Sequence, residues 1–284
     1  MHEFAVFILS HGRSDRVITY DTLIKEGYTG KIYIVLDDED EEIPEYEKRF
    51  ENIVIFSKAD YREKFDIGDS GGNEKVVVYA RNAMPDIARK CGYRYYIVLD
   101  DDYNSFMYRW PEGEKLAFLY PKSLDDLFEA TFDFLDDSGA LTVCYAQGGD
   151  FIGGINGGWQ KRLMRKAMNV WFCDTEKPFK FYGRINEDTT TYVLLGQRGK
   201  LFFTITDLSI NQIQTQSNKG GLTDIYLEKG TYYKSFYSVM FNPSCVKVAS
   251  MGEKHMRIHH LVNWTACTPK ILSEKWKKNI KIHL

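Results

Sequence analysis

The sequence predicts an α/β protein with a mainly parallel sheet covered by helices on both faces. The chain of 284 residues is long enough to bury a large core, and 44% hydrophobic with 27% charged residues is an ordinary globular composition. In the first hundred residues, short apolar runs alternate with helical segments. Because these runs are apolar on both faces, we expect strands buried between two layers of helices.

Four apolar runs in this first part are expected to be strands, and two segments between them helices. The strands are expected at 4–9, 32–36, 53–56 and 95–99, and the helices at 15–26 and 75–91. Gly27 and Gly92 end the helices, and Pro85 indicates that the second helix begins late or is kinked. Ligands bind at the carboxyl ends of parallel strands, so a site is expected in the segments that follow these strands. Those segments are 10–13, 37–40, 58–60 and 100–102.

The second part of the chain is expected to mix helices, strands and loops. The expected elements are a helix with an acidic outer face at 124–137, a strand at 140–145, a glycine-dense loop at 147–159, a helix at 159–172, a strand at 201–205 and a polar loop at 212–221. The helix at 159–172 would carry basic residues on one side, and the chain ends in a basic tail. No linker interrupts the sequence, so we expect one continuous domain.

The net charge of −3 is unevenly distributed along the chain. Residues 1–142 contain 17 Lys and Arg against 30 Asp and Glu, whereas residues 143–284 contain 20 against 10. An acidic half favours cations and a basic half favours a polyanion. Two solvated faces would give the same counts, and charge alone does not separate these interpretations.

The sequence favours a cytosolic protein. No stretch approaches the roughly 20 apolar residues of a membrane span, and residues 1–6 lack the pattern of a secretory signal. The five cysteines are odd in number and widely spaced, so neither a disulfide framework nor a Cys-x-x-Cys zinc site follows from them. We expect reduced and mostly buried thiols.

Three consecutive carboxylates, Asp100 to Asp102, follow the apolar run 95–99. Carboxylates at the end of a buried strand are costly unless something neutralises them. In an extended chain Asp100 and Asp102 share a face and converge, and such hard oxygen ligands suit Mg²⁺ or Mn²⁺. A solvated acidic loop is the alternative, and it is our interpretation of 37–42, with Asp37 as a candidate exception.

A second acidic motif is formed by Asn186, Glu187 and Asp188. A carboxylate at the mouth of a strand or helix can act as a general base on an acceptor hydroxyl. A helix cap made by Asn186 or Asp188 is equally consistent with the pattern. Histidines at 255, 259 and 260 lie among basic and apolar residues, where packing is their usual role, although one could complete the coordination of a carboxylate-bound ion.

Polar side chains next to other expected strand and helix ends suit a diphosphate. Arg13 and Arg81 could bind it bidentately, with Asn82 beside them, although each could equally form a structural contact. Tryptophans and tyrosines interleaved with bases in the second half could stack on nucleobases, but core packing is their commoner use. The sequence has no H-E-x-x-H, phosphate-loop or G-x-S-x-G motif.

Four motifs in order resemble a glycosyltransferase of the GT-A fold: 10–13 (SHGR), 79–82 (YARN), 98–103 (VLDDDY) and 186–188 (NED). The segments 230–239 (GTYYKSFYSV), 257–260 (RIHH) and 269–272 (PKIL) are more particular. With them, nearly the whole chain resembles the TET/J-binding-protein-associated glycosyltransferases, which are largely encoded by bacteriophages. The resemblance implies a GT-A-like α/β fold, with a mixed, mainly parallel sheet flanked by helices.

The activity that the resemblance implies is transfer of a sugar from a nucleotide sugar, expected to be a UDP-sugar, to the hydroxyl of 5-hydroxymethylpyrimidines in DNA. A divalent ion, Mn²⁺ or Mg²⁺, would assist. Residues 1–122 would form the nucleotide-sugar and metal-binding half, and 123–284 the acceptor-binding half with the basic tail. The protein would act in the cytoplasm, that of an infected bacterium if it is phage-encoded, and no membrane partner is expected.

The resemblance also implies a role for individual residues. Asp100 and Asp102 would hold the ion with His259 or His260, and Asp188, with Glu187 beside it, would be the catalytic base. The donor pocket would be lined by Ser10, Arg13, Asp37, Arg81, Asn82, Asp100 and Asp101. The expected DNA-binding residues, taken from the basic half, are Trp159, Lys161, Arg162, Arg165, Lys277 and Lys278.

Three other functions are compatible with parts of the pattern. The acceptor of a GT-A enzyme could be a glycan, a lipid or a protein. A metal-dependent nuclease or nucleotidyltransferase could use Asp100, Asp102 and Asp188. A catalytically inert DNA-binding module would need only the basic half. Cytosine and uracil acceptors, and retention or inversion at the anomeric carbon, are equally compatible with the sequence.

Overall fold

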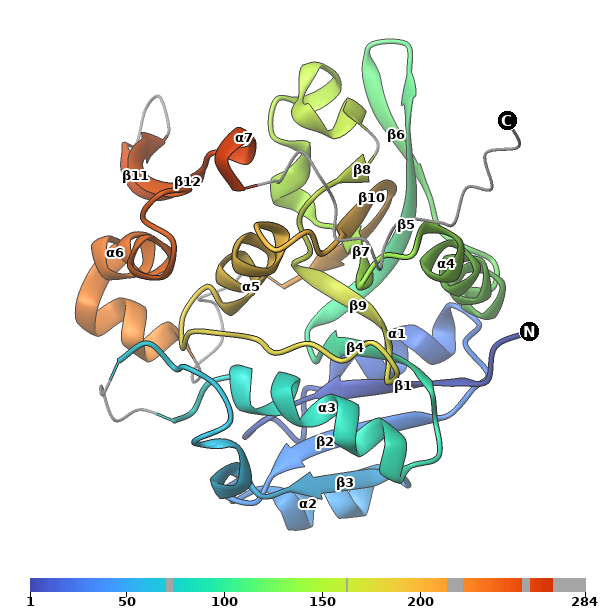
Figure 1. Cartoon of the computed structure of the whole chain (residues 1–284). Coiled ribbons are helices and arrows are strands. Elements are labelled where there is room, and N and C mark those ends of the chain that lie inside the picture. The colour runs from blue at the N-terminus through green and yellow to red at the C-terminus, as the bar shows by residue number, and fades with distance from the viewer. Residues whose placement is uncertain (70–73, 162, 214–221, 252–255, 268–284) are drawn as a thin grey trace, which may run out of the picture.

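The apolar runs of the sequence form a ten-stranded mixed sheet, shown in the computed structural model of Figure 1. The structure describes residues 1–69, 74–161, 163–213, 222–251 and 256–267. Nine strands follow the order β3-β2-β1-β4-β9-β7-β10-β5-β6, and β8 pairs with β10. The strands are β1 (Phe4–Leu9), β2 (Ile32–Asp37), β3 (Ile53–Phe56), β4 (Tyr95–Asp100), β5 (Tyr103–Glu112), β6 (Lys115–Leu119), β7 (Thr142–Ala146), β8 (Leu163–Met164), β9 (Asn169–Asp174) and β10 (Phe202–Gln212).

The first four strands run parallel, as the sequence predicts. Val6 of β1 lies beside Ile32 of β2 and Ile97 of β4, and these side chains are almost fully buried. Further along the sheet, β9 runs antiparallel to both β4 and β7, and β10 runs parallel to β7. The expected mixed sheet flanked by helices is therefore confirmed.

Two layers of helices cover the sheet. Helices α1, α2 and α4 contribute to one core, around Leu23, Tyr46 and Phe128, and α3, α5 and α6 contribute to the other, around Met84 and Tyr237. The helices are α1 (Ile18–Lys25), α2 (Ile43–Arg49), α3 (Val78–Lys90), α4 (Leu124–Ser138), α5 (Glu187–Gly196), α6 (Leu222–Phe241) and α7 (Trp264–Cys267), with 3₁₀ turns η1 (Lys58–Tyr61), η2 (Gly148–Phe151), η3 (Gly154–Asn156) and η4 (Gly158–Lys161).

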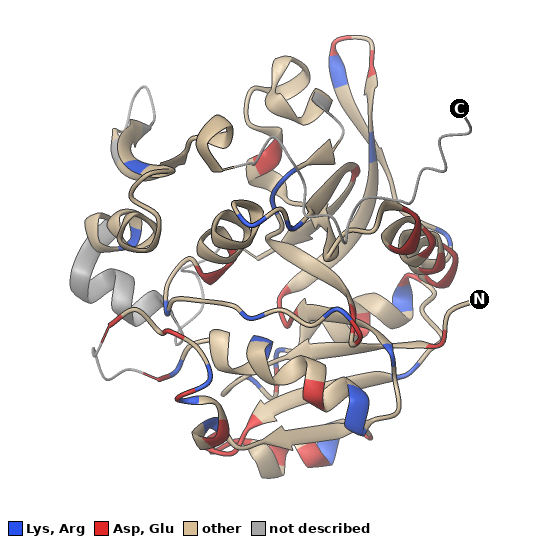
Figure 2. Ribbon diagram, viewed as in Figure 1, with Lys and Arg blue, Asp and Glu red and all other residues tan. Residues whose placement is uncertain are grey.

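Local signals account for the helix ends that the sequence predicts. Ser123 caps α4, accepting the N–H of Asp126 at 3.2 Å, and Gly139 ends it with a φ of 65°, a left-handed value that glycine adopts without strain. The acidic residues of α4 lie on its outer side, as expected (Figure 2). Helix α3 begins at Val78, ahead of Pro85, so the proline lies inside the helix and does not set its start.

The helix expected at 159–172 is wrong. This segment forms the turn η4, the short strand β8 and most of β9. All six residues of β9 are buried, because the strand lies between β4 and β7 and both of its faces are covered. The helix was expected because basic residues at 161, 162, 165 and 166 would share one side, whereas only the end of the segment is the apolar run that fits a buried strand.

Several elements had no counterpart in the sequence prediction. Strands β5 and β6 form a hairpin in which Glu112 pairs with Lys115, and Gly113 between them has a φ of 59°. Helix α6 and the hairpin of β11 (Val246–Met251) and β12 (Arg257–Val262) form a separate part beside α5. The expected polar loop at 212–221 and basic tail at 270–281 lie largely outside the described residues.

None of the five cysteines, all of which lie in the described ranges, forms a disulfide, and four of them are buried, as expected. Among the helices that the structure describes, none is both long and apolar enough to cross a bilayer.

Candidate active site

The order of the first strands creates a place for a ligand. The chain passes from β1 through β2 to β3 and then returns to β4 on the other side of β1. In open α/β sheets, ligands bind at such a switch point, beyond the carboxyl ends of the strands. The segment after β1 and the acidic segment after β4 meet there.

Ser10 and Arg13 hold Asp101 at this switch point. The Ser10 hydroxyl donates to Oδ2 of Asp101 at 2.6 Å, and Arg13 Nη1 lies 2.9 Å from Oδ1. Tyr46 supports both partners, since its hydroxyl lies 2.7 Å from Ser10 Oγ and accepts the Arg13 N–H at 2.9 Å. Burial raises the pKa of Asp101, and Arg13 and Ser10 oppose that effect. Three of the predicted donor residues therefore lie together.

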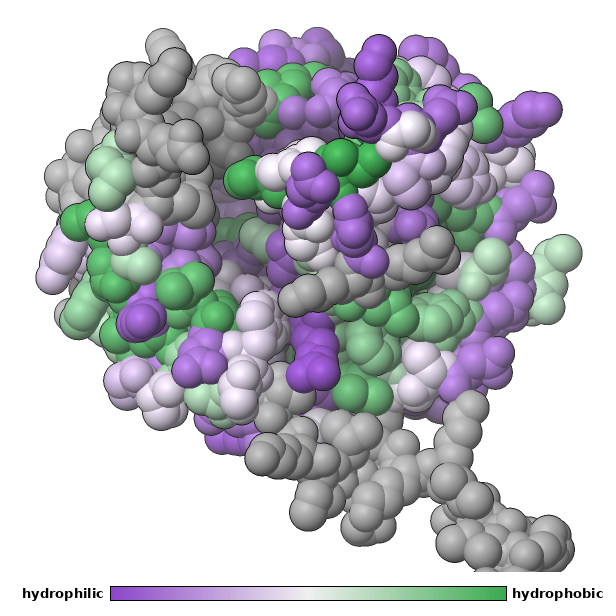
Figure 3. Space-filling view, turned by 90° about the horizontal axis from the view of Figure 1, so that it is seen from above, coloured by the Kyte–Doolittle hydropathy of each residue, from purple (hydrophilic) through white to green (hydrophobic). Residues whose placement is uncertain are grey.

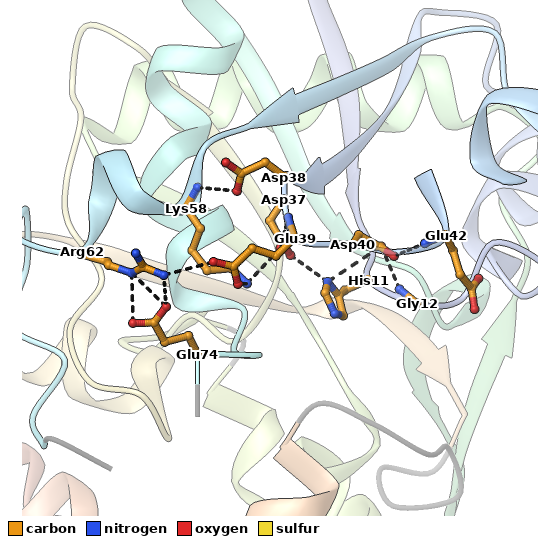
Figure 4. Close-up of polar contacts among 10 residues, drawn as sticks. All are labelled: His11, Gly12, Asp37, Asp38, Glu39, Asp40, Glu42, Lys58, Arg62 and Glu74. Atoms are coloured by element: carbon orange, nitrogen blue, oxygen red, sulfur yellow. Dashed lines mark hydrogen bonds and ion pairs between the residues drawn. The ribbon is translucent and has the colours of Figure 1, made fainter. Parts of the chain in front are cut away.

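Asp37, at the end of β2, is the centre of a second polar cluster (Figure 4). His11 Nδ1 lies 2.8 Å from one carboxylate oxygen, and the Lys58 ammonium lies 2.9 Å from the other. Burial raises the pKa of Asp37, but the His11 and Lys58 contacts outweigh burial and lower it to about 2. Lys58, which is 1% exposed, also binds Glu39 at 2.9 Å. Asp37 is thus a buried, ionised acceptor, unlike a solvated loop residue.

The chain turns after Asp100, so the extended geometry expected for the three acids is wrong. β4 ends at Asp100, and Asp101 and Asp102 form the turn that leads into β5. Asp102 is half-buried and makes no ion pair with any residue that the structure describes. Burial and the neighbouring Asp100 and Asp101 raise the pKa of Asp102 to about 7. An uncompensated acid of this kind fits a divalent cation as its missing partner.

The predicted metal ligands do not form a closed coordination shell. A metal site needs several ligand atoms of His, Cys, Asp or Glu close together. Within the described ranges, three such atoms lie within 4.8 Å of one another only at His2, Glu129 and Asp133, beside the amino terminus. His2 lies against these acids through ordinary hydrogen bonds, such as its Nδ1 at 2.9 Å from Glu129. An ion at Asp100 and Asp102 would therefore need ligands from a donor diphosphate or water.

Arg81 of α3 joins the two acidic motifs. Its Nη2 lies 3.4 Å from Asp100 Oδ1, and its Nη1 lies 3.0 Å from Glu187 Oε1. The Nη1 contact is an ion pair without hydrogen-bond alignment, since that nitrogen has no aligned acceptor among the described residues. Arg81 and Glu187 are each 6% exposed. Burial raises the pKa of Glu187, an effect that the Arg81 charge opposes.

Asp188 lies in the first turn of α5, with positive charges around it. Its Oδ1 accepts the N–H of Thr189 at 2.6 Å. Burial raises the pKa of Asp188, while Thr189, Arg81, Lys234 and Lys166 lower it. Of the two alternatives for a helix cap, Asn186 makes no capping bond and instead donates to the Lys234 carbonyl at 2.7 Å, whereas Asp188 does accept a backbone N–H of the first turn, that of Thr189. Lys166, whose ammonium pairs with Asp150, was not among the predicted site residues.

His260 contacts the beginning of α5. Its Nδ1 lies 3.5 Å from Asn186 Nδ2, and its Nε2 lies 3.4 Å from Thr189 Oγ1. Burial, with His259 and Lys234, lowers the pKa of His260 to about 4, so the ring is neutral near pH 7. The ring of His259 lies 4.2 Å from that of His260, centre to centre. A neutral imidazole is the form that binds metals.

Asn82 holds the segment ahead of α5. Its amide nitrogen donates to the Phe181 carbonyl at 3.0 Å, and its oxygen accepts the Phe181 N–H at 2.9 Å. Both ends of this side chain are therefore engaged with backbone in the structure, although it was predicted to line the donor pocket.

The predicted DNA-binding residues have different outcomes. Trp159 is 2% exposed and donates to the Gly154 carbonyl, so its indole ring cannot stack on a base and that prediction is wrong. Arg165 is exposed, on the segment between β8 and β9. The side chain of Lys161 and all of Arg162, Lys277 and Lys278 lie outside what the structure describes.

The residues that the sequence interpretation missed are His11, Tyr46, Lys58 and Lys166. Lys58 begins η1, separated from the end of β3 by one residue, and lies in the segment 58–60 that the sequence placed at the site, so its position was a usable signal. Tyr46 lies on α2, and nothing local to it indicates a contact with Ser10. Seen from above, the surface is hollowed between the part formed by α6, β11 and β12 and the part formed by β5, β6 and α4 (Figure 3). Helix α5 lies between these parts in Figure 1.

This fold and this site define an α/β protein with an acidic, arginine-bridged centre at a topological switch point. The family model of the TET-associated glycosyltransferases matches residues 4–221, so the chain belongs to that family and is a glycosyltransferase. The resemblance drawn from the motifs is thereby confirmed. No curated protein matches the sequence.

Solved structures with a similar course of the chain include a synthase, a synthetase and A197 from STIV. Glucosyl-3-phosphoglycerate synthase from Mycobacterium tuberculosis, in complex with Mn²⁺, UDP and phosphoglyceric acid, has 9% identity and a TM-score of 0.46, with 92% of this chain and 87% of that chain covered. CMP:2-keto-3-deoxy-manno-octonic acid synthetase, in complex with CTP, has 10% identity and a TM-score of 0.40, with 80% and 96% covered. A197 from STIV has 15% identity and a TM-score of 0.38, with 75% and 86% covered.

Proposed function

We propose that this glycosyltransferase moves a sugar from a nucleoside diphosphate sugar to the hydroxyl of 5-hydroxymethylpyrimidines in DNA. The observation that carries the proposal is the position of Arg81 between Asp100 and Glu187, which brings the two acidic motifs to one place. In the reaction, the acceptor oxygen bonds to the anomeric carbon as the bond from that carbon to the diphosphate breaks. The hydroxyl proton passes to a carboxylate.

The donor would bind at the switch point, in the half formed by residues 1–122. Asp37 is held ionised by His11 and Lys58, and it would accept hydrogen bonds from the nucleoside. Arg13, which is partly exposed beside Asp101, would contact the diphosphate. Asp100 and Asp102 would hold Mn²⁺ or Mg²⁺, with His260 or His259 as a further candidate ligand. When bound, the ion supplies positive charge that stabilises the departing diphosphate.

Asp188 is the better candidate for the catalytic base, and Glu187 for its support. Glu187 is paired with Arg81 and buried, which fixes its position. Asp188 is only half-buried, and burial raises its pKa toward the range in which a carboxylate removes a proton effectively. The positive charges of Arg81, Lys166 and Lys234 oppose that rise in the pKa of Asp188.

The DNA acceptor is supported by charge and by the family. Residues 143–284 contain 20 Lys and Arg against 10 Asp and Glu, and a basic surface binds the phosphate backbone. The family takes its name from its association with TET, and the motif resemblance pairs that association with hydroxymethylated pyrimidines. The acceptor half would be residues 123–284 of one continuous domain. A DNA acceptor implies the cytoplasm, that of an infected bacterium if the protein is phage-encoded.

Donor turnover tests the proposal. The protein is incubated with Mn²⁺ and a panel of nucleotide sugars, with and without DNA that contains 5-hydroxymethylpyrimidines, and released nucleoside diphosphate is measured. Release that rises with this DNA and is lost in Asp102→Ala supports the proposal. Release that does not change with DNA would contradict DNA as the acceptor and would favour a glycan, lipid or protein acceptor. Cleavage or extension of DNA without any nucleotide sugar would instead indicate a nuclease or nucleotidyltransferase.

A further inference from the structure

We infer that Tyr103 and Asn169 are positioning residues for Asp100, an inference that rests on the proposed metal role of that carboxylate. Tyr103 begins β5 and Asn169 begins β9, and they are 1% and 6% exposed. The Tyr103 hydroxyl lies 3.4 Å from Asp100 Oδ2 and 3.2 Å from Asn169 Oδ1. Asn169 lies outside the motifs that carry the family resemblance, whereas Tyr103 ends one of them, 98–103 (VLDDDY), without having been assigned a role.

The hydroxyl of Tyr103 has one proton and two acceptors within reach. Asn169 cannot turn away, because its amide nitrogen donates to Gln147 Oε1 at 2.6 Å and thereby fixes Oδ1 toward Tyr103. Gln147 is anchored in turn, since its N–H donates to Asp150 at 2.9 Å and Asp150 pairs with Lys166. The tyrosine hydroxyl is therefore held beside Asp100 by a hydrogen-bonded chain that extends to the segment after β7.

The backbone of β9 is distorted at the residue that follows Asn169. The ladder between β4 and β9 stops at Val98 and Trp171, and the register between β7 and β9 shifts between Val143 and Tyr145. Val170 has a φ of 56°, a left-handed value that is unfavourable for a β-branched side chain. A bulge of this kind re-aims a neighbouring side chain, and backbone strain concentrates at functional sites. Here the bulge leaves Asn169 facing the end of β4.

Asp100 is consequently held from two sides. Tyr103 contacts Oδ2, and Arg81 Nη2 lies 3.4 Å from Oδ1. Nη2 of Arg81 also lies 3.5 Å from Oδ2, so Oδ2 has two donors, whereas Oδ1 keeps a second lone pair with which it can bind an ion. Groups that orient metal ligands from behind typically change metal affinity by about 10–100-fold when they are removed. We therefore expect the Tyr103 hydroxyl to strengthen ion binding by fixing the rotamer of Asp100.

The experiment compares two tyrosines that each place a hydroxyl on a carboxylate. Tyr103→Phe removes the hydroxyl and keeps the buried ring. The matched control is Tyr95→Phe, since Tyr95 donates to Asp136 at 2.7 Å from the opposite end of β4. Mn²⁺ is titrated into the full chain with excess UDP, and free Mn²⁺ is measured by electron paramagnetic resonance. Mn²⁺ binding should weaken about tenfold or more in Tyr103→Phe and stay within about twofold in the control.

Two further variants separate the possible outcomes. Asn169→Leu should weaken Mn²⁺ binding in the same direction as Tyr103→Phe, and excess Mn²⁺ should restore donor turnover in both, which a merely destabilised protein would not show. If Asp100→Ala loses Mn²⁺ while Tyr103→Phe binds it like the wild type, the inference is wrong and the proposed function stands. If Asp100→Ala and the wild type bind Mn²⁺ equally, the proposed metal role is wrong and the inference falls with it.

Discussion

Arg81 Nη1 lies 3.0 Å from Glu187 Oε1, and this contact connects α3 to the first turn of α5. The same guanidinium reaches Asp100 at the end of β4. Two acidic motifs far apart in the sequence therefore share one buried guanidinium group, that of Arg81. The contact explains why a carboxylate can be kept at the buried start of α5, because an unpaired charge in that position would be strongly unfavourable.

Replacing Arg81 should strongly lower the free energy of unfolding, because the loss includes an unpaired buried charge as well as the lost packing. Arg81→Met leaves Glu187 buried without a partner, so we expect a loss of about 3–5 kcal/mol in the free energy of unfolding. The double variant Arg81→Met/Glu187→Met should lose less than the two single variants together, because it removes both charges. Urea unfolding of all four proteins measures this coupling. Strictly additive losses would show that the two residues do not support each other.

The pH dependence of stability should reveal the Asp37 cluster. The folded-state pKa of Asp37 is lowered to about 2 from an ordinary value of 3.8. A depressed folded-state pKa gives stability that is present above the unfolded value and lost as the pH falls toward the folded one. The full contribution is about 2 kcal/mol, of which about 1 kcal/mol should disappear between pH 5 and pH 3.

The measurement compares urea unfolding of the wild type and Asp37→Asn over that pH range. The stability difference between them should shrink as the pH falls, and the exposed Asp60→Asn should show no such trend. A difference that stays constant from pH 5 to pH 3 would mean that His11 and Lys58 do not hold the Asp37 carboxylate ionised.

Asn82 offers a test of structural against donor-binding roles. Asn82→Ala leaves the Phe181 N–H and carbonyl without their partners, so it should cost about 1–3 kcal/mol of stability. The exposed Asn156→Ala is the control and should have little effect. Thermal or urea unfolding decides the matter. A variant of unchanged stability and a raised donor KM would instead return Asn82 to the donor pocket.

The parallel strands were predictable because a strand that is buried on both faces is a continuous apolar run in the sequence. The runs at 4–9 and 53–56 became β1 and β3 with the same ends. The start of β9 was instead assigned to a helix, because the basic residues ahead of it would share one side of a helix. Strand β9 also runs antiparallel inside an otherwise parallel region, and no local pattern reveals which strand will insert there.

The site was predictable where it depends on strand ends and hidden where it depends on strand order. The segments after β1 and β4 were expected to carry it, and Ser10, Arg13 and Asp101 do meet there. The pairing of Asp37 with Lys58 requires β2 and β3 to be neighbours. Asn169, which contacts Tyr103, directly precedes Val170, whose left-handed backbone is a distortion that valine itself disfavours.

DNA binding by the basic half should depend on salt. Arg165 is exposed and precedes β9, so we expect it to contact a phosphate. Arg165→Ala should then weaken binding of any DNA sequence and reduce the slope of log Kd against log salt by about one. Lys48→Ala is the control, because Lys48 lies in the acidic half and pairs with Glu45 at 2.5 Å. An unchanged slope in Arg165→Ala would place the DNA elsewhere.

The central claim is that the carboxylates around Arg81 transfer a sugar to hydroxymethylated DNA. The most direct measurement is the mass of nucleosides after DNA containing 5-hydroxymethylpyrimidines is incubated with the protein, Mn²⁺ and the nucleotide sugar that it consumes. We expect the modified nucleoside to gain the mass of one sugar residue, and we expect no gain with Asp188→Asn. Consumption of the nucleotide sugar with the nucleoside mass unchanged would contradict the claim.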